Sequence, residues 1–357
     1  MEFLMKEALE RGEEIEKQYN DLFEGPVIKV IGVGGAGCNM VDWLYRKGIE
    51  GAEIIATNTD AKHLQVVQAH KKVLLGPNTR KGLGAGGYPE AGAEAAKESI
   101  AELKDSIKGS DMVFICAGMG GGTGTGAAPI VAEISKQEGA IVIGVVTMPF
   151  KMEGTRIEKA EMGLSNLRRH CHTVIVIDNN RLLELAGNLP LRKAFNLANE
   201  IIAVMIQGIV ETIQLPSYVQ LDFADVKAIM SEGGLAVIGI GESASERRAE
   251  EAVNKALKHP LLPVDYSGGK GALIQITAGP DFKLEELDLI GNTVKSKLSE
   301  EAQVIWGVRL KDDMEGKIRV ITIITGVKSP YVLGREEDYG LSSLKSKKND
   351  LGIDEIF

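Results

Sequence analysis

The sequence GMGGGTGTG, residues 118–126, places six glycines in nine positions between an apolar segment at 112–117 and a helical pattern at 127–137. So many glycines would cost too much conformational entropy in a plain connection. Backbone amides at the start of a helix, by contrast, bind phosphate. Thr123 and Thr125 add hydroxyls that can hold phosphate oxygens. The segment therefore predicts a phosphate-binding loop.

A second glycine turn, GVGGAG at residues 32–37, also lies between an apolar segment and a helix. This GxGxxG pattern is weak alone, because tight turns produce the same spacing. Short apolar segments, separated mostly by helical patterns, lie at 27–33, 54–58, 73–75, 112–117, 141–147 and 174–178. This alternation predicts an α/β fold, a doubly wound parallel sheet with helices on both faces. In the strand order 3-2-1-4-5, both glycine turns face one crevice.

A long helix is expected at 191–214, ending before Pro216, and its many apolar side chains predict burial on most sides. Beyond it, a smaller α+β domain is expected, with strands at 236–240, 272–277, 304–310 and 318–327 and helices near 246–257 and 284–298. The expected divisions are an acidic helical extension at 1–26, the α/β domain with its long helix at 27–216, the α+β domain at 217–330 and a flexible tail at 331–357.

Two further segments are expected at the same edge of the sheet as the glycine turns. ATNTD, residues 56–60, closes the second strand, where a doubly wound fold usually contacts a nucleoside or phosphate. GLGAGG, residues 82–87, is a flexible loop that could sense a terminal phosphate or serve as a plain linker. The chain contains no GxxxxGK[ST] pattern, which excludes the P-loop solution.

The composition limits the partners and the compartment. A net charge of −9 argues against duplex nucleic acid as the main partner, because phosphate backbones attract basic surfaces. The three cysteines show no CxxC spacing, and the HCH sequence at 170–172 lacks further ligands, so neither a zinc site nor a disulfide framework is indicated. The N-terminal segment is charged, and no later segment reaches the roughly 18 apolar residues of a membrane span. We expect a cytoplasmic protein with no direct membrane insertion.

Four motifs together resemble FtsZ, the prokaryotic relative of tubulin: GVGGAGCN at 32–39, ATNTD at 56–60, GLGAGG at 82–87 and GMGGGTGTGAAP at 118–129. The GGGTGTG element is the tubulin signature, and the resemblance extends over about residues 27–330. It implies a GTP-binding α/β domain joined by a long central helix to the smaller domain, with GTP and GDP as ligands. It also implies head-to-tail filaments that form the mid-cell division ring. The short linker and the EGTRIE sequence resemble an archaeal-type member.

The resemblance assigns nucleotide-binding residues position by position. Glu153 resembles the acid that contacts the ribose, with Arg156 nearby, although many relatives carry this arginine one position later, where this chain has isoleucine. Asn179 and Asn199 resemble the residues that read the base. Phe195 resembles the ring stacked on guanine, but it could also be an ordinary core residue of the long helix. The remaining residues assigned in this way are Gly34, Gly35, Ala36, Gly37, Cys38, Asn39, Asn58, Asp60, Gly84, Ala85, Gly86, Gly120, Gly121, Gly122, Thr123 and Gly124.

The sequence QLDFAD, residues 220–225, follows the long helix. Asp222 and Asp225 share a face of a starting helix, where they could simply be an N-cap and a partner of the helix dipole. Their resemblance to the synergy loop of the family implies that they enter the next subunit's pocket, position the attacking water and help accept its proton. Gln220 stands where the family usually has Asn. Mg²⁺ is expected to bind the phosphates through waters, with no direct protein ligand.

The resemblance implies two partners, namely further copies of the chain and an adaptor protein that tethers filaments to the membrane. The terminal LGIDEIF, residues 351–357, resembles the peptide that binds such adaptors, although a disordered tip is the alternative. Two other functions stay open. One is a tubulin-like protein that shapes the cell and does not divide it. The other is an NAD-dependent oxidoreductase, which residues 32–37 would suit but which leaves residues 118–126 without a function.

Overall fold

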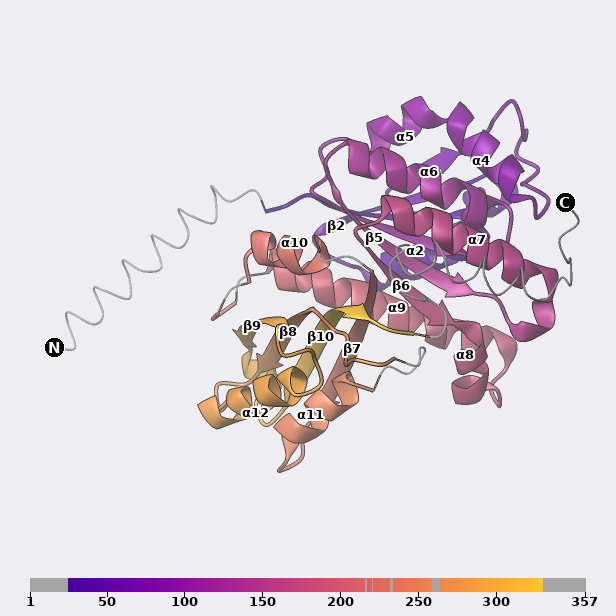
Figure 1. The fold of residues 1–357 in the computed structure, drawn as a ribbon. Coiled ribbons are helices and arrows are strands. Elements are labelled where there is room, and N and C mark those ends of the chain that lie inside the picture. The colour runs from indigo at the N-terminus through magenta and orange to yellow at the C-terminus, as the bar shows by residue number, and fades with distance from the viewer. Residues whose placement is uncertain (1–24, 216, 220, 232–233, 259–263, 330–357) are drawn as a thin grey trace, which may run out of the picture.

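The computed structural model describes residues 25–329 apart from 216, 220, 232–233 and 259–263, and it contains one ten-stranded sheet (Figure 1). The strand order is β3-β2-β1-β4-β5-β6-β7-β10-β8-β9. The first six strands, all parallel, are β1 (Ile28–Val33), β2 (Ala52–Asn58), β3 (Lys71–Leu74), β4 (Met112–Gly118), β5 (Ile141–Met148) and β6 (Thr173–Asp178). The predicted doubly wound order 3-2-1-4-5 is confirmed.

Helices cover both faces of this parallel part, because its strands present apolar side chains to both sides. Ile31 and Val113 lie in one hydrophobic core, whereas Val30 and Phe114 lie in the other. The first face carries α4 (Pro89–Glu98), α5 (Ile100–Ile107), α6 (Thr123–Gln137) and α7 (Thr155–His170), and the second carries α2 (Gly34–Lys47) and the central helix. Two short helices, α3 (Ala61–Val66) and α8 (Asn179–Ala186), follow β2 and β6.

The central helix α9 spans Leu191–Gln214, as predicted. Its later part is core, since Ile202, Ile206 and Ile213 are buried among residues of the parallel strands. The expectation of burial on most sides is wrong for the first two turns, where Leu191 is 73% exposed. Within the described part of the chain, α9 is the one helix with the length and composition to cross a membrane, and its packing against the sheet accounts for that composition.

The second set of elements continues the same sheet. It contains α10 (Phe223–Ser231), β7 (Leu235–Ser243), α11 (Arg248–Ala256), β8 (Gly271–Ala278), α12 (Leu284–Lys295), β9 (Gln303–Leu310) and β10 (Ile318–Val327). Strand β10 is antiparallel to β7 and β8, and β8 is parallel to β9. A single parallel pair, Val174 with Leu235, joins β6 to β7. This continuity had not been predicted, since a separate smaller domain was expected. The domain boundaries stay a prediction, and the predicted N-terminal helix at 1–24 and the tail at 331–357 lie outside the described residues.

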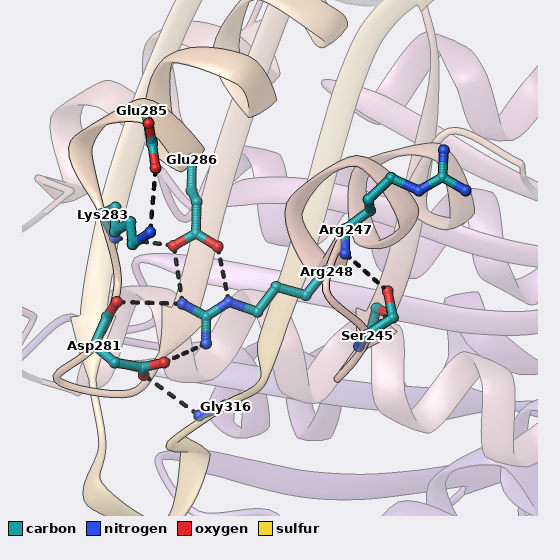
Figure 2. A network of polar contacts seen from close by, with 9 residues as sticks. Ser245, Arg247, Arg248, Asp281, Lys283, Glu285, Glu286 and Gly316 are labelled. Carbon is teal, nitrogen blue, oxygen red and sulfur yellow. Dashed lines mark hydrogen bonds and ion pairs between the residues drawn. The ribbon is translucent and has the colours of Figure 1, made fainter.

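A buried arginine fastens the two helices of the smaller part together (Figure 2). The Arg248 guanidinium donates to both carboxylate oxygens of Glu286, at 2.7 and 2.9 Å, and to Asp281 Oδ2 at 2.5 Å. Such two-pronged pairing is the strongest geometry available to an arginine and a carboxylate. The hydrogen bonds from Arg248 lower the pKa of Asp281. The start of α11 is thereby fixed to the start of α12, away from the glycine loops.

Candidate functional site

A cavity of about 290 Å³ opens at the carboxyl ends of β1, β4 and β5, where both glycine turns meet. The predicted residues that line it are Gly35, Ala36, Gly121, Gly122, Thr123, Gly124, Glu153, Arg156 and Asn179. A larger groove of about 750 Å³ lies between α12 and strands β8 and β9. It is lined by apolar residues such as Leu287, Val304 and Trp306, and its charged residues include the acids Glu285 and Asp288, which would repel a phosphate. We therefore place the functional site at the smaller cavity.

Two helix N-termini converge on this cavity. Helix α2 begins at Gly34 and α6 at Thr123, and neither start is capped by a side chain. The first amides of a helix have no internal partner and carry the positive end of the helix dipole. An anion between the two loops would therefore receive donors from both sides, as a chain of phosphates requires.

The threonines of the second loop have different roles. Thr123 lines the cavity, and its hydroxyl lies 2.6 Å from that of Thr59. Thr125 does not line it. Its Oγ1 instead accepts a hydrogen bond from the Gly120 amide at 2.9 Å. The expectation that both hydroxyls hold phosphate is wrong for Thr125, which supports the loop from behind. Gly120 is likewise a supporting residue and not part of the cavity wall.

The turn after β2 lies beside the cavity without lining it. His63 joins two predicted residues, since Asn58 Nδ2 donates to its Nδ1 at 3.1 Å and its Nε2 donates to Asn39 Oδ1 at 3.0 Å. Asp60 caps α3 by accepting from the His63 amide at 3.1 Å. Fully buried Thr59 reaches the second glycine loop. Neither Thr59 nor His63 was among the predicted residues, although both lie within or just after the ATNTD motif.

Cys38 contributes no side chain to the site. Its thiol is buried and points to the carbonyl of Thr57 at 3.4 Å. Burial raises the pKa of Cys38 to about 12, so the thiol stays neutral and unreactive. Gly37, the residue before it, packs directly against the Cys116 carbonyl and not into the cavity. At these two predicted positions only backbone groups are left to act on a ligand.

The 82–87 loop is tied to the second glycine loop. The Gly84 amide donates to the Thr59 carbonyl at 3.0 Å, and a Cβ atom on Gly122 would lie 2.8 Å from the Cβ of Ala85. None of Gly84, Ala85 and Gly86 lines the cavity. The loop is therefore no plain linker, because it contacts both Thr59 and the glycine loop.

Each carboxylate oxygen of Glu153, which lines the cavity, accepts one hydrogen bond. Its Oε1 accepts from the Phe150 amide at 2.9 Å and its Oε2 from Arg156 Nη1 at 2.7 Å. Glu153 and Arg156 both line the cavity, so Arg156 lies at the site although relatives often carry the arginine one position later. Thr147 and Pro149 also line it and had not been predicted.

Phe150 and Phe195 form a pair of aromatic rings. Phe195 is 39% exposed, so the interpretation of it as an ordinary core residue is wrong. Its ring meets that of Phe150 edge to face, with centroids 6.2 Å apart. Asn199 is one turn further along α9, on the same face as Phe195. Asn179 begins α8 and lines the cavity. Phe150, Phe195 and Asn199 do not line the cavity, but Phe150 directly follows Pro149, which does. The ring pair therefore lies next to the cavity, where a planar base could stack.

The predicted carboxylates lie at the far end of the central helix. The backbone carbonyl of Asp222 accepts from the amides of Asp225 and Val226, which starts α10. Asp222 is exposed and Asp225 half-buried. From Phe195 to Gln214 the helix rises through nineteen residues at 1.5 Å each, about 28 Å. Neither carboxylate can therefore line the cavity of its own chain. Gln220 lies outside the described residues. Figure 1 shows α8 and α10 at opposite ends of α9.

No metal-binding cluster is found among the described residues, none of which form a group of three or more His, Cys, Asp or Glu. In the HCH sequence, Cys171 is buried, and His172 Nδ1 accepts from the Val142 amide at 2.9 Å. The expectation that Mg²⁺ has no direct protein ligand at the site stays a prediction.

Two family models match the chain. The model of the Tubulin/FtsZ family, GTPase domain, matches residues 27–187, and that of the FtsZ family, C-terminal domain, matches residues 234–328. Among curated relatives, "Cell division protein FtsZ 2" of Methanocaldococcus jannaschii is 53% identical over 93% of this chain and 88% of its own length. "Cell division protein FtsZ 1" of Thermococcus kodakarensis is 55% identical over 87% of this chain and 83% of its own.

Solved structures of FtsZ and of CetZ2 are also similar to this chain. An empty FtsZ dimer of M. jannaschii matches with a TM-score of 0.80 and 44% identity, covering 97% of this chain and 99% of that one. A protofilament of CetZ2 from Haloferax volcanii matches with a TM-score of 0.74 and covers 91% of this chain and 99% of that one. At 23% identity, the second likeness shows the fold alone.

Proposed function

This chain belongs to the Tubulin/FtsZ family, and we propose that it is a cell-division GTPase that polymerises head to tail and hydrolyses GTP where two subunits meet. The observation that carries the shared site is the length of α9. About 28 Å of helix lies between Phe195 and Gln214, and the exposed Asp222 follows eight residues later. Asp222 does not line the cavity of its own chain, which favours cooperation between different subunits.

In this proposal the two glycine loops hold the phosphates of GTP. The cavity of about 290 Å³ is at the lower limit for a ligand pocket, which suits the phosphates and ribose with the base stacked outside, near Phe150 and Phe195. We assign Glu153 to the ribose hydroxyls, and Asn179 and Asn199 to the edge of guanine. Mg²⁺ bound with GTP, for which no direct protein ligand is assigned, would neutralise phosphate charge during transfer.

The cavity lacks a group that could activate water. Among the described residues that line it, Glu153 is the one carboxylate; it is paired with Arg156 and the Phe150 amide, and we assign it to the ribose. A subunit alone can therefore hold GTP but has no free base beside the γ-phosphate.

Stacking supplies the missing groups. Asp222 and Asp225 of one subunit would approach the γ-phosphate bound by the next, with Gln220 beside them. The carboxylates orient a water for attack on the γ-phosphorus and accept its proton. The bond between that phosphorus and the β–γ bridging oxygen breaks, which leaves GDP and phosphate. GDP then remains in the joint between subunits, so hydrolysis limits how long a filament lasts.

Two alternative functions were predicted, an oxidoreductase and a protein that shapes the cell. The oxidoreductase alternative is wrong, because the chain belongs to a GTPase family and the second glycine loop shares the cavity with the first. The second candidate function is that of a tubulin-like protein that shapes the cell and does not divide it. Relatives at about half identity that are named for cell division favour the division role.

We further propose that residues 351–357 bind an adaptor that tethers filaments to the membrane at mid-cell. Deleting these residues in cells is expected to abolish mid-cell rings while purified protein still polymerises. Intact rings after the deletion would contradict the adaptor proposal.

The function is tested with D222A and D225A. Both variants are expected to bind GTP and to sediment as polymer like the unchanged protein, but to release little phosphate. The matched control is Glu285→Ala, which removes an exposed acid from the first turn of another helix, α12, and should leave hydrolysis unchanged. Normal phosphate release by both aspartate variants would contradict the proposal.

A further inference from the structure

Arg309 of β9 reaches the end of the central helix. Its Nη2 donates to the carbonyl oxygens of Glu211 at 2.5 Å and Leu215 at 3.3 Å, and its Nη1 lies 3.7 Å from the Glu211 carboxylate. The last carbonyls of a helix carry negative partial charge, which a cation stabilises, and the Glu211 carbonyl also accepts from the Leu215 amide at 3.1 Å. Arg309 is only 5% exposed. Its guanidinium therefore belongs to the anchoring of α9 and does not face solvent.

The neighbouring residue holds the chain that leaves α9. Val308 and Val219 exchange two backbone hydrogen bonds, of 3.0 and 3.1 Å, in an isolated antiparallel bridge. Strand β9 is the last strand of the sheet, so its outer edge is free to accept this short partner. Val219 precedes Asp222 by three residues.

Gly307 completes the attachment. A Cβ atom at this position would lie 2.8 Å from Leu221 Cγ and 2.9 Å from the Val219 carbonyl oxygen. Leu221, directly before Asp222, is buried in the core that also holds α9. Residues 307–309 of β9 thus contact the chain at Glu211, Val219 and Leu221.

We infer that Arg309 is a positioning residue for GTP hydrolysis, which fixes the end of α9 and so sets where Asp222 and Asp225 point. This inference rests on the proposed function, in which these carboxylates act on the nucleotide of the next subunit. Arg309 does not line the cavity of its own chain, and its burial keeps it from reaching another. In this inference its effect passes through the chain that leads from Glu211 to Asp222 and Asp225. Small displacements of catalytic groups are costly, since about 1 Å can lower a rate by roughly a hundredfold.

The test measures what the Asp222–Asp225 segment of one subunit contributes to the contact between two subunits. Full-length D222A/D225A subunits, which keep a normal cavity, are polymerised in large excess with GTP, and a small amount of a second protein is added. Each added subunit then contacts two D222A/D225A subunits. At one contact its own Asp222 and Asp225 face a normal cavity. At the other contact its own cavity faces the substituted residues 222 and 225. Phosphate release is measured per added subunit recovered in the sedimented polymer. The added protein is the unchanged chain, Arg309→Met or Arg309→Lys.

Unchanged subunits are expected to restore hydrolysis. Arg309→Met is expected to restore a rate of phosphate release about tenfold lower than that of unchanged subunits. The KM for GTP should be unaltered, because the nucleotide contacts are intact. Arg309→Lys keeps the buried charge but loses the several N–H donors of the guanidinium, so its rate of phosphate release should lie between those of the unchanged chain and Arg309→Met. The matched control Arg319→Met removes an exposed arginine of β10 that pairs with Glu242, and should behave as the unchanged chain.

The outcomes separate the two claims. If added unchanged subunits restore no hydrolysis, the shared site is wrong and this inference fails with it. If unchanged subunits restore hydrolysis and both Arg309 variants do so equally well, the shared site stands and the positioning role is overturned. A lowered rate for Arg309→Met, partly recovered in Arg309→Lys, supports the role of Arg309.

Discussion

A Cβ atom on Gly34 would lie 2.8 Å from the backbone nitrogen of Gly124, so the two glycine loops touch through bare backbone. Gly34 also has φ +74°, in the left-handed region that side chains disfavour. The two helix starts that form the cavity are therefore held at a separation that no side chain at position 34 would permit. The cavity depends on this contact.

Gly34→Ala should separate the loops and weaken GTP binding. The left-handed backbone alone costs an alanine about 1–2 kcal/mol, and the clash with Gly124 adds to it. We expect at least about a tenfold rise in the Kd for GTP, measured by fluorescent-nucleotide titration. The matched control is Gly291→Ala in α12, where a Cβ meets nothing within 4 Å, and it should bind GTP normally. Equal affinities for the two variants would contradict this role of Gly34.

Thr59→Val should loosen the second glycine loop. The substitution keeps the shape of a buried residue but removes the hydroxyl that lies 2.6 Å from Thr123 Oγ1. The loss of one buried hydrogen bond is expected to lower the free energy of unfolding by about 1 kcal/mol. GTP affinity should fall as well, because Thr123 lines the cavity. Urea denaturation and nucleotide titration check both effects. Thr59→Ser keeps the hydroxyl and should retain both properties; a Ser variant as weak as the Val variant would count against the hydrogen bond.

Phe195→Ala should weaken nucleotide binding with little effect on stability, since the ring is already 39% exposed. Stacking of an aromatic ring on a base contributes about 1–3 kcal/mol, so the Kd for GTP should rise by roughly five- to a hundredfold. Leu197→Ala is the control, because Leu197 is on the same helix and is 37% exposed. Unchanged affinity in Phe195→Ala would show that the base lies elsewhere.

His172 makes the protein less stable in mild acid. Burial, together with the charges of Lys136 and Lys227, lowers the pKa of His172 below its ordinary value of 6.5. Its Nδ1 accepts from the Val142 amide, which requires the neutral ring. Between the folded pKa and pH 6.5 only the unfolded chain binds this proton, so stability falls as the pH drops below about 6.5.

The measurement is the urea midpoint between pH 7.5 and 5, compared with His172→Asn. Asparagine offers an oxygen to the same amide but does not titrate, so its stability should change less over this range. Identical pH profiles for the two proteins would contradict the contribution of His172.

The sequence predicted the elements whose signals are local. The apolar strands, the glycine turns and the 24-residue helix α9 all follow from the spacing of apolar residues and glycines, and each formed as expected. The contact of Thr59 with Thr123 could not be predicted in this way. It joins residues 64 positions apart, and no spacing rule links two threonines in different loops.

Two further features also depend on tertiary structure. The pairing of Val174 with Leu235, which makes one continuous sheet, depends on how α9 returns the chain to β6. Thr123 and Thr125 lie in the first turn of α6, where residues two apart point to nearly opposite sides, so only Thr125 turns toward Gly120. The sequence did not show that the helix begins at Thr123. The exposure of Leu191 shows the same limit, because apolar composition does not reveal which turns of a helix find partners.

The central claim is that the cavity of one subunit and the carboxylates of another form a single catalytic site. GTP hydrolysis per subunit, measured as a function of protein concentration, tests it most directly. We predict almost no turnover below a threshold concentration at which sedimenting polymer first forms, and a steep rise above it. A rate per subunit that stays constant down to concentrations without polymer would contradict the claim.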